Sequence, residues 1–171
     1  MNPRRADFDR FVSDSSDTLL RTAYLIVWDL GEAEDLVQET LFEVARRWPR
    51  IRRMERPLAY ARRILVNRAL SGSVRRSRRR QELTAMPSEP AVVMDGLAES
   101  GAADELMAAL ATLPPRQRAV LVLRYFLDLP EAEVAAALKC SLGTVKSTAS
   151  RGLARLEQAM RPAHDPRSIP T

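Results

Sequence analysis

The chain of 171 residues is 46% hydrophobic and 29% charged, with a formal net charge of +5. This composition is typical of a soluble globular protein of one or two small domains, and the abundance of Ala, Leu, Arg and Glu favours helices. The sequence has no apolar run of the ~20 residues that cross a bilayer and no signal peptide after Met1, so we expect a cytoplasmic protein. A single cysteine, Cys140, excludes an internal disulfide and a cysteine-rich metal site, and a single histidine, His164, leaves little for histidine-based catalysis.

The charges are unevenly distributed along the chain. Residues 46–80 contain fourteen arginines and one acid, Glu55, whereas residues 81–110 contain six acids and no basic residue. A basic block next to an acidic one indicates charged partners rather than a particular fold.

Three helices are predicted in the first half of the chain. The first spans about residues 6–28, and the second, about residues 32–48, has the clearest apolar periodicity. Pro49 ends the second helix, residues 50–56 form a basic loop, and Pro57 starts the third helix. The apolar stripe of the second helix consists of Ala33, Leu36, Val37, Thr40, Leu41, Val44 and Trp48.

The other side of the second predicted helix is polar, with one exception. Asp35, Gln38 and Glu39 lie off the apolar stripe together with Phe42. An exposed phenylalanine next to acids and an amide is a candidate for docking another protein. The spacing alone equally allows an ordinary solvated face with Phe42 at its margin, so both interpretations stay open at this point.

The third predicted helix carries arginine and asparagine away from its apolar side. These residues are Arg62, Arg63, Asn67 and Arg68, and a run of arginines at 75–80 continues the helix. Such a run is often only a solvated tail. Its continuity with a helix that already presents arginines favours contact with nucleic acid.

Proline, glycine and serine punctuate residues 81–101, which show no sustained helical period. This stretch therefore predicts a linker between two helical domains, one at residues 5–80 and one at residues 102–160. Residues 161–171 are predicted to be a disordered tail.

The second domain begins with a helix that Pro114 stops, and Pro115 starts the next helix. Arg116 and Arg118 lie in the first turn of that helix, where we expect them to be available for phosphate. Tyr125 is expected in the core with the apolar residues that precede it.

Residues 130–160 have the pattern of a helix-turn-helix, in which the turn is Lys139-Cys140-Ser141. Ser141 is a good N-cap for the second helix, because its hydroxyl can accept an unpaired N–H of the first turn. Cys140 is expected to be a small buried apolar residue. The predicted buried stripe of the second helix is Val145, Ala149, Leu153 and Leu156.

The opposite face of this second helix carries hydrogen-bond donors close to its N-terminus, where a recognition helix meets DNA. They are Lys146, Ser147, Ser150 and Arg151. An ordinary helical hairpin with a solvated polar face is the alternative interpretation of the pattern.

Two blocks of sequence resemble the extracytoplasmic-function (ECF) sigma factors, a minimal group within the sigma-70 family of bacterial transcription initiation factors. The first block is EAEDLVQETLFEVARRW at 32–48, followed by PLAYARRILVNRAL at 57–70. The second is LPPRQRAVLVLRYFLDLPEAEVAAALKCSLGTVKSTASRGLARL at 113–156. The second block alone is similar to other helix-turn-helix regulators, but both blocks in this order across an acidic linker are specific.

The resemblance implies a protein without catalytic residues or cofactors that binds core RNA polymerase and directs it to promoters. The helix at 32–48 would dock on the clamp coiled coil of the largest subunit, with Asp35, Gln38, Glu39 and Phe42 as docking residues. The flap of the second-largest subunit and an anti-sigma factor are further implied partners.

The resemblance also divides promoter recognition between the domains. Residues 50–70 would recognise and melt the −10 element, with Asn67 facing DNA and with Arg62, Arg63 and Arg68 as phosphate partners. The second helix of the helix-turn-helix would read the −35 element through Lys146, Ser147, Ser150 and Arg151.

Two features depart from the family pattern. Lys139 occupies a position where the turn often has glycine, so a positive φ there would cost on the order of 1 kcal/mol. The loop at 49–56 is richer in arginine than is usual in the family, which leaves open which of its residues capture a flipped base.

The sigma-factor hypothesis has two alternatives. A free-standing, dimeric helix-turn-helix regulator would leave the face at 32–48 and the basic block unexplained. A nuclease that uses Asp35 and Glu39 would need a third ligand cluster or a glycine-rich phosphate loop, and the sequence has neither.

Overall fold

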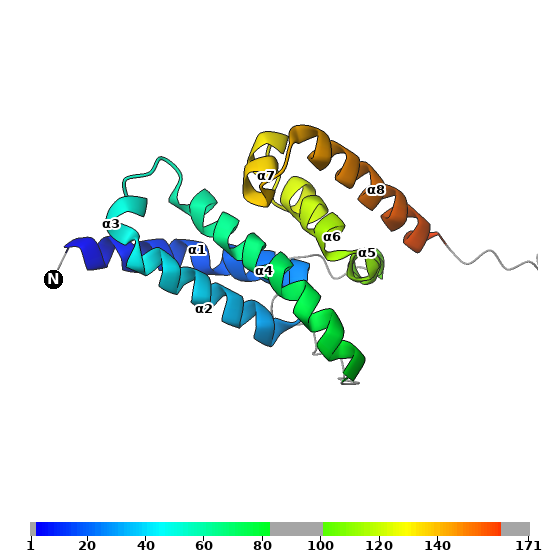
Figure 1. Ribbon diagram of the computed structural model, residues 1–171, viewed down its shortest axis with the longest axis horizontal. Coiled ribbons are helices and arrows are strands. Elements are labelled where there is room, and N and C mark those ends of the chain that lie inside the picture. The colour runs from blue at the N-terminus through cyan, green and yellow to red at the C-terminus, as the bar shows by residue number, and fades with distance from the viewer. Residues whose placement is uncertain (1–2, 83–100, 162–171) are drawn as a thin grey trace, which may run out of the picture.

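The structure is a computed structural model and describes residues 3–82 and 101–161. Every regular element in these two ranges is helical, which confirms the predicted all-α fold. One group of helices precedes the gap at 83–100, and a second group follows it and lies against the first (Figure 1). The elements are α1 (Pro3–Val27), α2 (Leu30–Arg46), α3 (Trp48–Ile51), α4 (Pro57–Glu82), α5 (Gly101–Thr112), α6 (Pro115–Leu121), the π-helical η1 (Val122–Phe126), α7 (Glu131–Leu138) and α8 (Leu142–Met160).

The turn between α1 and α2 is set by two residues. Trp28 adopts φ 62° and stacks on Tyr24 with 5.3 Å between the ring centroids. Asp29 is the N-cap of α2, and its carboxylate accepts the backbone N–H of Glu32 at 2.8 Å. Because this cap satisfies a donor of the first turn, α2 begins at Leu30, two residues before the predicted start.

The predicted basic loop is partly helical. Pro49 does not simply terminate a helix, because it lies in the first turn of α3, where a missing N–H is tolerated. Trp48, the first residue of α3, is buried and packs against α1, with its ring 5.3 Å from that of Phe8 and 5.1 Å from that of Phe11. This packing fixes the start of the loop at 52–56.

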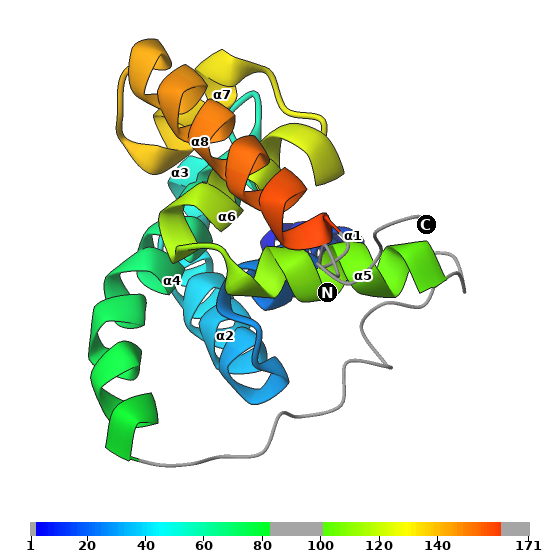
Figure 2. The same cartoon turned by 90° about the vertical axis from the view of Figure 1, so that its right-hand side faces the viewer.

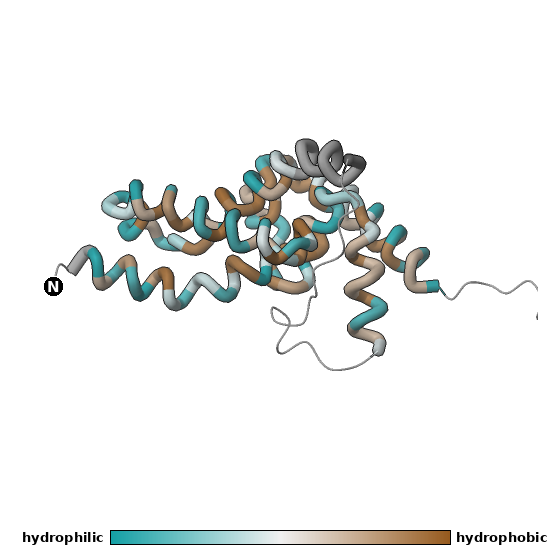
Figure 3. Tube along the Cα trace, turned by 90° about the horizontal axis from the view of Figure 1, so that it is seen from below, coloured by the Kyte–Doolittle hydropathy of each residue, from teal (hydrophilic) through white to brown (hydrophobic). Residues whose placement is uncertain are grey.

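The two groups of helices share one continuous apolar core. Residues such as Leu19, Leu36 and Leu65 of the first group belong to the same buried cluster as Leu110 and Val134 of the second. α6 and η1 pack against α1, and α7 packs against α4. Figure 2 shows α7 and α8 on top of the first group, and Figure 3 shows the hydrophobic segments concentrated where the helices face one another.

Two apolar residues that were predicted to be buried are exposed. Tyr125 lies in η1, where the π-helical turn shifts the side chain away from the α-helical phase, and it is 55% exposed. Leu153 is 41% exposed because its neighbour Gly152 faces α6 instead. A Cβ at Gly152 would lie 3.2 Å from Cγ of Leu121, so the glycine permits close approach of α8 to α6.

Among the described residues, no helix combines the length and the apolarity that a bilayer crossing requires.

Candidate nucleic-acid and polymerase interfaces

The α7–turn–α8 unit has the backbone geometry of a helix-turn-helix. Lys139 ends α7 with φ 51° and ψ 49°. This is the left-handed conformation for which many family members have glycine at this position. The N–H of Cys140 then donates to the carbonyl oxygen of Ala135 at 3.0 Å, and Cys140 is half-buried rather than fully buried. Ser141 caps α8 as predicted, because its hydroxyl accepts the N–H of Thr144 at 3.1 Å.

The predicted DNA-reading face of α8 is exposed. Lys146, Ser147, Ser150 and Arg151 all lie on this surface. Nε of Arg151 donates to the carbonyl oxygen of Ser147 at 3.2 Å, and Nζ of Lys146 lies 3.7 Å from a carboxylate oxygen of Glu131 in α7. The helix therefore presents cationic and hydroxyl groups at its N-terminal half, with Val145 and Ala149 buried behind them.

The predicted docking face of α2 is also exposed. Phe42 has 67% of its surface accessible, and Asp35, Gln38 and Glu39 are exposed on the same helix. The buried side of α2 includes Ala33, Leu36, Val37, Thr40 and Val44, as predicted.

Arg68 links α4 to this helix. Its guanidinium donates to Oε2 of Glu39 and to Oε2 of Glu43, each at 2.7 Å. The hydrogen bond from Arg68 lowers the pKa of Glu43, and the nearby Arg47 and Arg46 act in the same direction. Arg68 is thus directed towards α2, and Glu43, which the sequence did not single out, is one of its partners.

The other predicted −10 residues of α4 lie against α7. Nδ2 of Asn67 donates to the carbonyl oxygen of Ala137 at 2.8 Å and to that of Arg63 at 2.6 Å. Arg62 is buried, and burial lowers the pKa of its guanidinium. Of the four predicted residues, only Arg63 is exposed.

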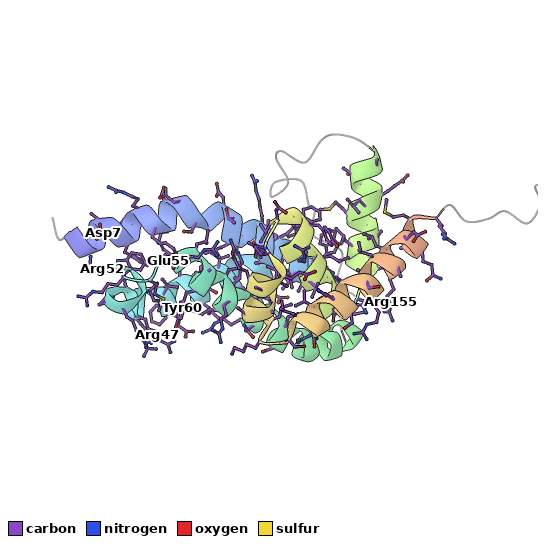
Figure 4. The ribbon with its side chains drawn as sticks, turned by 90° about the horizontal axis from the view of Figure 1, so that it is seen from above. Asp7, Arg47, Arg52, Glu55, Tyr60 and Arg155 are labelled. Carbon is purple, nitrogen blue, oxygen red and sulfur yellow. The ribbon has the colours of Figure 1, made fainter. Side chains whose placement is uncertain are left out.

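The loop before α4 is held by ion pairs and by a hydrogen bond next to it. Arg52 bonds Asp7 of α1 at 3.1 Å, and Arg47 donates to the hydroxyl of Tyr60 at 2.9 Å (Figure 4). Arg56 pairs with Glu133 of α7. An open groove of about 520 Å³ runs beside this region, with Arg47, Tyr60 and the Lys139 turn on its walls.

Arg118 is not available for phosphate in the structure, contrary to the prediction. It is buried, and its guanidinium donates to the carbonyl oxygens of Leu110, Ala111 and Leu113 in and after α5 and of Ile26 in α1. Its neighbour Arg116 is exposed, as expected. Residues two apart in a helix face nearly opposite sides. The spacing of Arg116 and Arg118 therefore indicates that only one of them can be exposed, and this signal could have distinguished them.

Within residues 3–82 and 101–161, no group of three or more His, Cys, Asp or Glu side chains could hold a metal ion. The exposed faces of α2 and α8 are suited to binding macromolecules, through their charged side chains and through one apolar anchor, Phe42.

Comparison with known proteins identifies the family. The model of sigma-70 region 2 matches residues 11–80, and the model of sigma-70 region 4 matches residues 103–156. The RNA polymerase sigma-E factor of Streptomyces coelicolor is 38% identical over 157 residues, which cover 90% of this chain and 86% of that protein. The chain belongs to the sigma-70 family. A second relative, the ECF RNA polymerase sigma factor SigG of Mycobacterium tuberculosis, is 29% identical over 98% of this chain and 52% of its own length.

A solved structure is similar over both halves of this sigma factor. It is the sigma factor RpoE in complex with the anti-sigma factor NepR from Bartonella quintana, with a TM-score of 0.72 and 25% identity. The match covers 90% of this chain and 96% of that chain, so it includes both helix groups.

The chain is therefore an ECF sigma factor, a transcription initiation factor that binds core RNA polymerase and directs it to promoter DNA. A free-standing helix-turn-helix regulator is not favoured, because region 2 and region 4 are both present. Sigma factors are non-catalytic, and the proposal of a nuclease receives no support from the family.

Proposed function

We propose that this sigma factor divides its work among three surfaces. The docking face, formed by Asp35, Gln38, Glu39 and Phe42 of α2, binds the clamp of the largest polymerase subunit. The −35 face, formed by Lys146, Ser147, Ser150 and Arg151 of α8 with Arg116 nearby, reads the −35 element. The −10 face, formed by Arg62, Arg63, Asn67 and Arg68 of α4, contacts the −10 element and assists melting.

The observation that supports this division is the contrast between the two open faces. An exposed phenylalanine flanked by acids suits a protein partner, because aromatic anchors dominate binding at interfaces. An exposed set of cationic and hydroxyl donors at the N-terminal half of α8 suits phosphates and base edges. The two faces lie on different helix groups, so they can serve different partners.

The same proposal includes the organisation of the chain. Residues 5–80 and 102–160 act as separate domains joined by residues 81–101, which is supported by family matches at 11–80 and 103–156. The protein acts in the cytoplasm. The polymerase flap and an anti-sigma factor are further partners, the latter because RpoE was crystallised with the anti-sigma factor NepR.

Reciprocal substitutions test the division. Replacement of Phe42 and Asp35 by Ala should weaken binding to core polymerase about 10- to 100-fold, because it removes an anchor side chain, without changing the DNA preference. Replacement of Lys146 and Arg151 by Ala should weaken binding to the −35 element and leave polymerase affinity unchanged.

The measurements are fluorescence anisotropy of the labelled factor with core polymerase and footprinting on a promoter mapped with purified factor and polymerase. Glu34→Ala on α2 and Arg161→Ala after α8 are exposed control variants. Loss of polymerase binding in the α8 double variant would contradict the division.

A further inference from the structure

Two adjoining cavities lie where α7 and the turn after it pack on α4. The larger is the open groove of about 520 Å³ that Lys139 lines, and the smaller is a pocket of about 240 Å³. Tyr60 and Arg63 line both cavities, so the two share a wall. The groove alone falls within the range of about 300–1,000 Å³ that is typical of small-molecule sites.

The groove carries more positive than negative charge. Its walls include the cations Arg47, Arg63, Arg68 and Lys139 but only one carboxylate, that of Glu43. This carboxylate is already paired, with Arg47 at 3.0 Å and with Arg68 at 2.7 Å. Arg63 and Lys139 are exposed, and neither has an ion-pair partner among the described residues. The groove therefore offers two uncompensated cations to an anion, and arginine and lysine are the side chains that bind phosphate best.

The pocket next to the groove has a different character. Four apolar side chains contribute to its walls together with the ring of Tyr60, namely Ala59, Leu129, Ala136 and Ala137. The hydroxyl of Tyr60 accepts a hydrogen bond from Arg47 at 2.9 Å, which fixes the position of the ring. A tyrosine ring beside apolar walls suits a planar aromatic group such as a nucleobase, which stacks on it.

One buried donor in this pocket lacks an acceptor. Arg62 lines the pocket and is 8% exposed, and its Nε is buried without a hydrogen-bond partner among residues 3–82 and 101–161. Burial lowers the pKa of this guanidinium, so the protein alone solvates the cation poorly. A carbonyl oxygen or ring nitrogen of a ligand would supply the acceptor, and the carboxylate of Glu133 in the α7 wall can accept an N–H. The edges of nucleobases carry acceptors and donors of these kinds.

We propose that the pocket and the groove together bind a free nucleoside triphosphate. The base occupies the pocket beside Tyr60 and Arg62, and the phosphates lie in the groove with Arg63 and Lys139. Both uncompensated cations line the groove, which matches a ligand whose charge is concentrated at one end. A nucleotide within a DNA strand fits less well, because its charge is spread over phosphates on both sides of the base.

The site overlaps one of the proposed promoter-binding faces. Arg63 and Asn67, which the proposed function assigns to the −10 element, both line the groove. A bound nucleotide would therefore cover part of the −10 face. Nucleotide binding itself does not depend on that assignment and is measured without DNA or polymerase.

Isothermal titration calorimetry of the free, full-length protein tests the proposal with ATP and GTP as probes. At least one of them should bind with a Kd below about 1 mM, roughly the weakest range in which enzymes use such metabolites. Inorganic triphosphate fills only the groove, and adenosine or guanosine fills only the pocket. Each of these fragments should therefore bind at least 10-fold more weakly than the nucleotide.

Two substitutions test the cavities separately. Lys139→Gly removes a cation of the groove and preserves the turn, because glycine adopts φ 51° without strain. It should weaken binding of both the nucleotide and inorganic triphosphate about 3- to 10-fold. Ala136→Trp fills the pocket from an exposed position of α7. It should reduce the affinity for the nucleotide to that for inorganic triphosphate, and leave the latter unchanged.

The matched controls lie outside both cavities. Arg53→Ala removes an exposed cation, and Ala154→Trp adds the same ring to an exposed position of α8. Both controls should bind nucleotide as the wild-type protein does. Far-UV circular dichroism of each variant reports whether its helices are intact.

The proposal is overturned if neither nucleotide binds, or if inorganic triphosphate binds as tightly as the nucleotide. It is also overturned if Lys139→Gly and Ala136→Trp bind nucleotide as their controls do, because the nucleotide would then lie elsewhere. A short single-stranded DNA oligonucleotide offers the same base and phosphate chemistry from a strand. If it binds more tightly than the nucleotide and is weakened equally by both substitutions, the cavities hold a DNA strand instead.

Discussion

The guanidinium of Arg118 donates hydrogen bonds to carbonyl oxygens at the ends of two helices. It donates to three carbonyl oxygens at the C-terminal end of α5 and to the carbonyl oxygen of Ile26 near the end of α1. The last carbonyls of a helix have no partner within the helix and carry partial negative charge. The guanidinium has several N–H donors in one plane, so it can donate hydrogen bonds to several of these carbonyl oxygens at once. Because its own donors then have acceptors, this cation can be buried.

Arg118→Ala should therefore lower the free energy of unfolding by about 3–5 kcal/mol, because it leaves several buried carbonyl groups without donors. Urea denaturation followed by circular dichroism measures this loss. Arg116→Ala, two residues away and exposed, should change stability by no more than about 0.5 kcal/mol. Equal effects of the two substitutions would show that the carbonyl network contributes little.

The position of α8 depends on its closest approach to α6. Gly152 lies against Leu121, and even a Cβ would be 3.2 Å from two atoms of that leucine. Interiors are close-packed, so there is no room for a larger side chain at this point without moving one of the helices. The glycine thus determines how deeply the recognition helix sits on its support.

Gly152→Leu should destabilise the protein by about 1–3 kcal/mol through overpacking. It should also weaken DNA binding, since displacement of α8 moves Lys146 and Arg151 with it. Ala154→Leu is the matched control, because this alanine is exposed on the same helix and its replacement should be nearly neutral. Thermal unfolding distinguishes the two variants, and a neutral Gly152→Leu would mean that α6 and α8 can separate at no cost.

The sequence correctly predicted the features that depend only on the residues of one helix, namely its apolar stripe and its cap. The stripe of α2 and the cap at Ser141 follow from local spacing and chemistry, and both are present. Leu153 and Tyr125 were wrongly predicted to be buried. On α8, Gly152 rather than Leu153 faces α6, and at Tyr125 a π-helical turn shifts the helical phase.

Contacts between the helix groups could not be predicted in the same way. Arg62 and Asn67 have the chemistry of a DNA-binding face whether or not another helix covers them. The partner of Asn67 is a backbone carbonyl of Ala137, seventy residues further along the chain, and a backbone acceptor leaves no signature in the sequence. Packing of α7 on α4 is therefore information that only the three-dimensional arrangement carries.

The excess of positive charge on the protein is only partly available to DNA. The chain has 27 lysines and arginines, but Arg56 and Arg68 are paired with carboxylates, and Arg62 and Arg118 are buried. The −35 face, in contrast, keeps Lys146 and Arg151 exposed, with Arg155 further along α8 (Figure 4). Non-specific DNA binding by the free protein should therefore reflect a few phosphate contacts rather than the total charge.

The salt dependence of DNA binding measures the number of phosphate contacts. Four phosphate contacts would give a slope of log Kobs against log salt of about −3.6, since each contributes about −0.9 on duplex DNA. Lys146→Ala and Arg151→Ala should each reduce the slope by about one, whereas Arg10→Ala, exposed on α1, should leave it unchanged. Anisotropy titrations of a 30-base-pair duplex of arbitrary sequence between 50 and 200 mM salt, roughly the range over which counterion release is strong, would measure these slopes. A slope that the α8 substitutions do not alter would place the DNA contacts elsewhere on the molecule and would contradict the assignment of the −35 face.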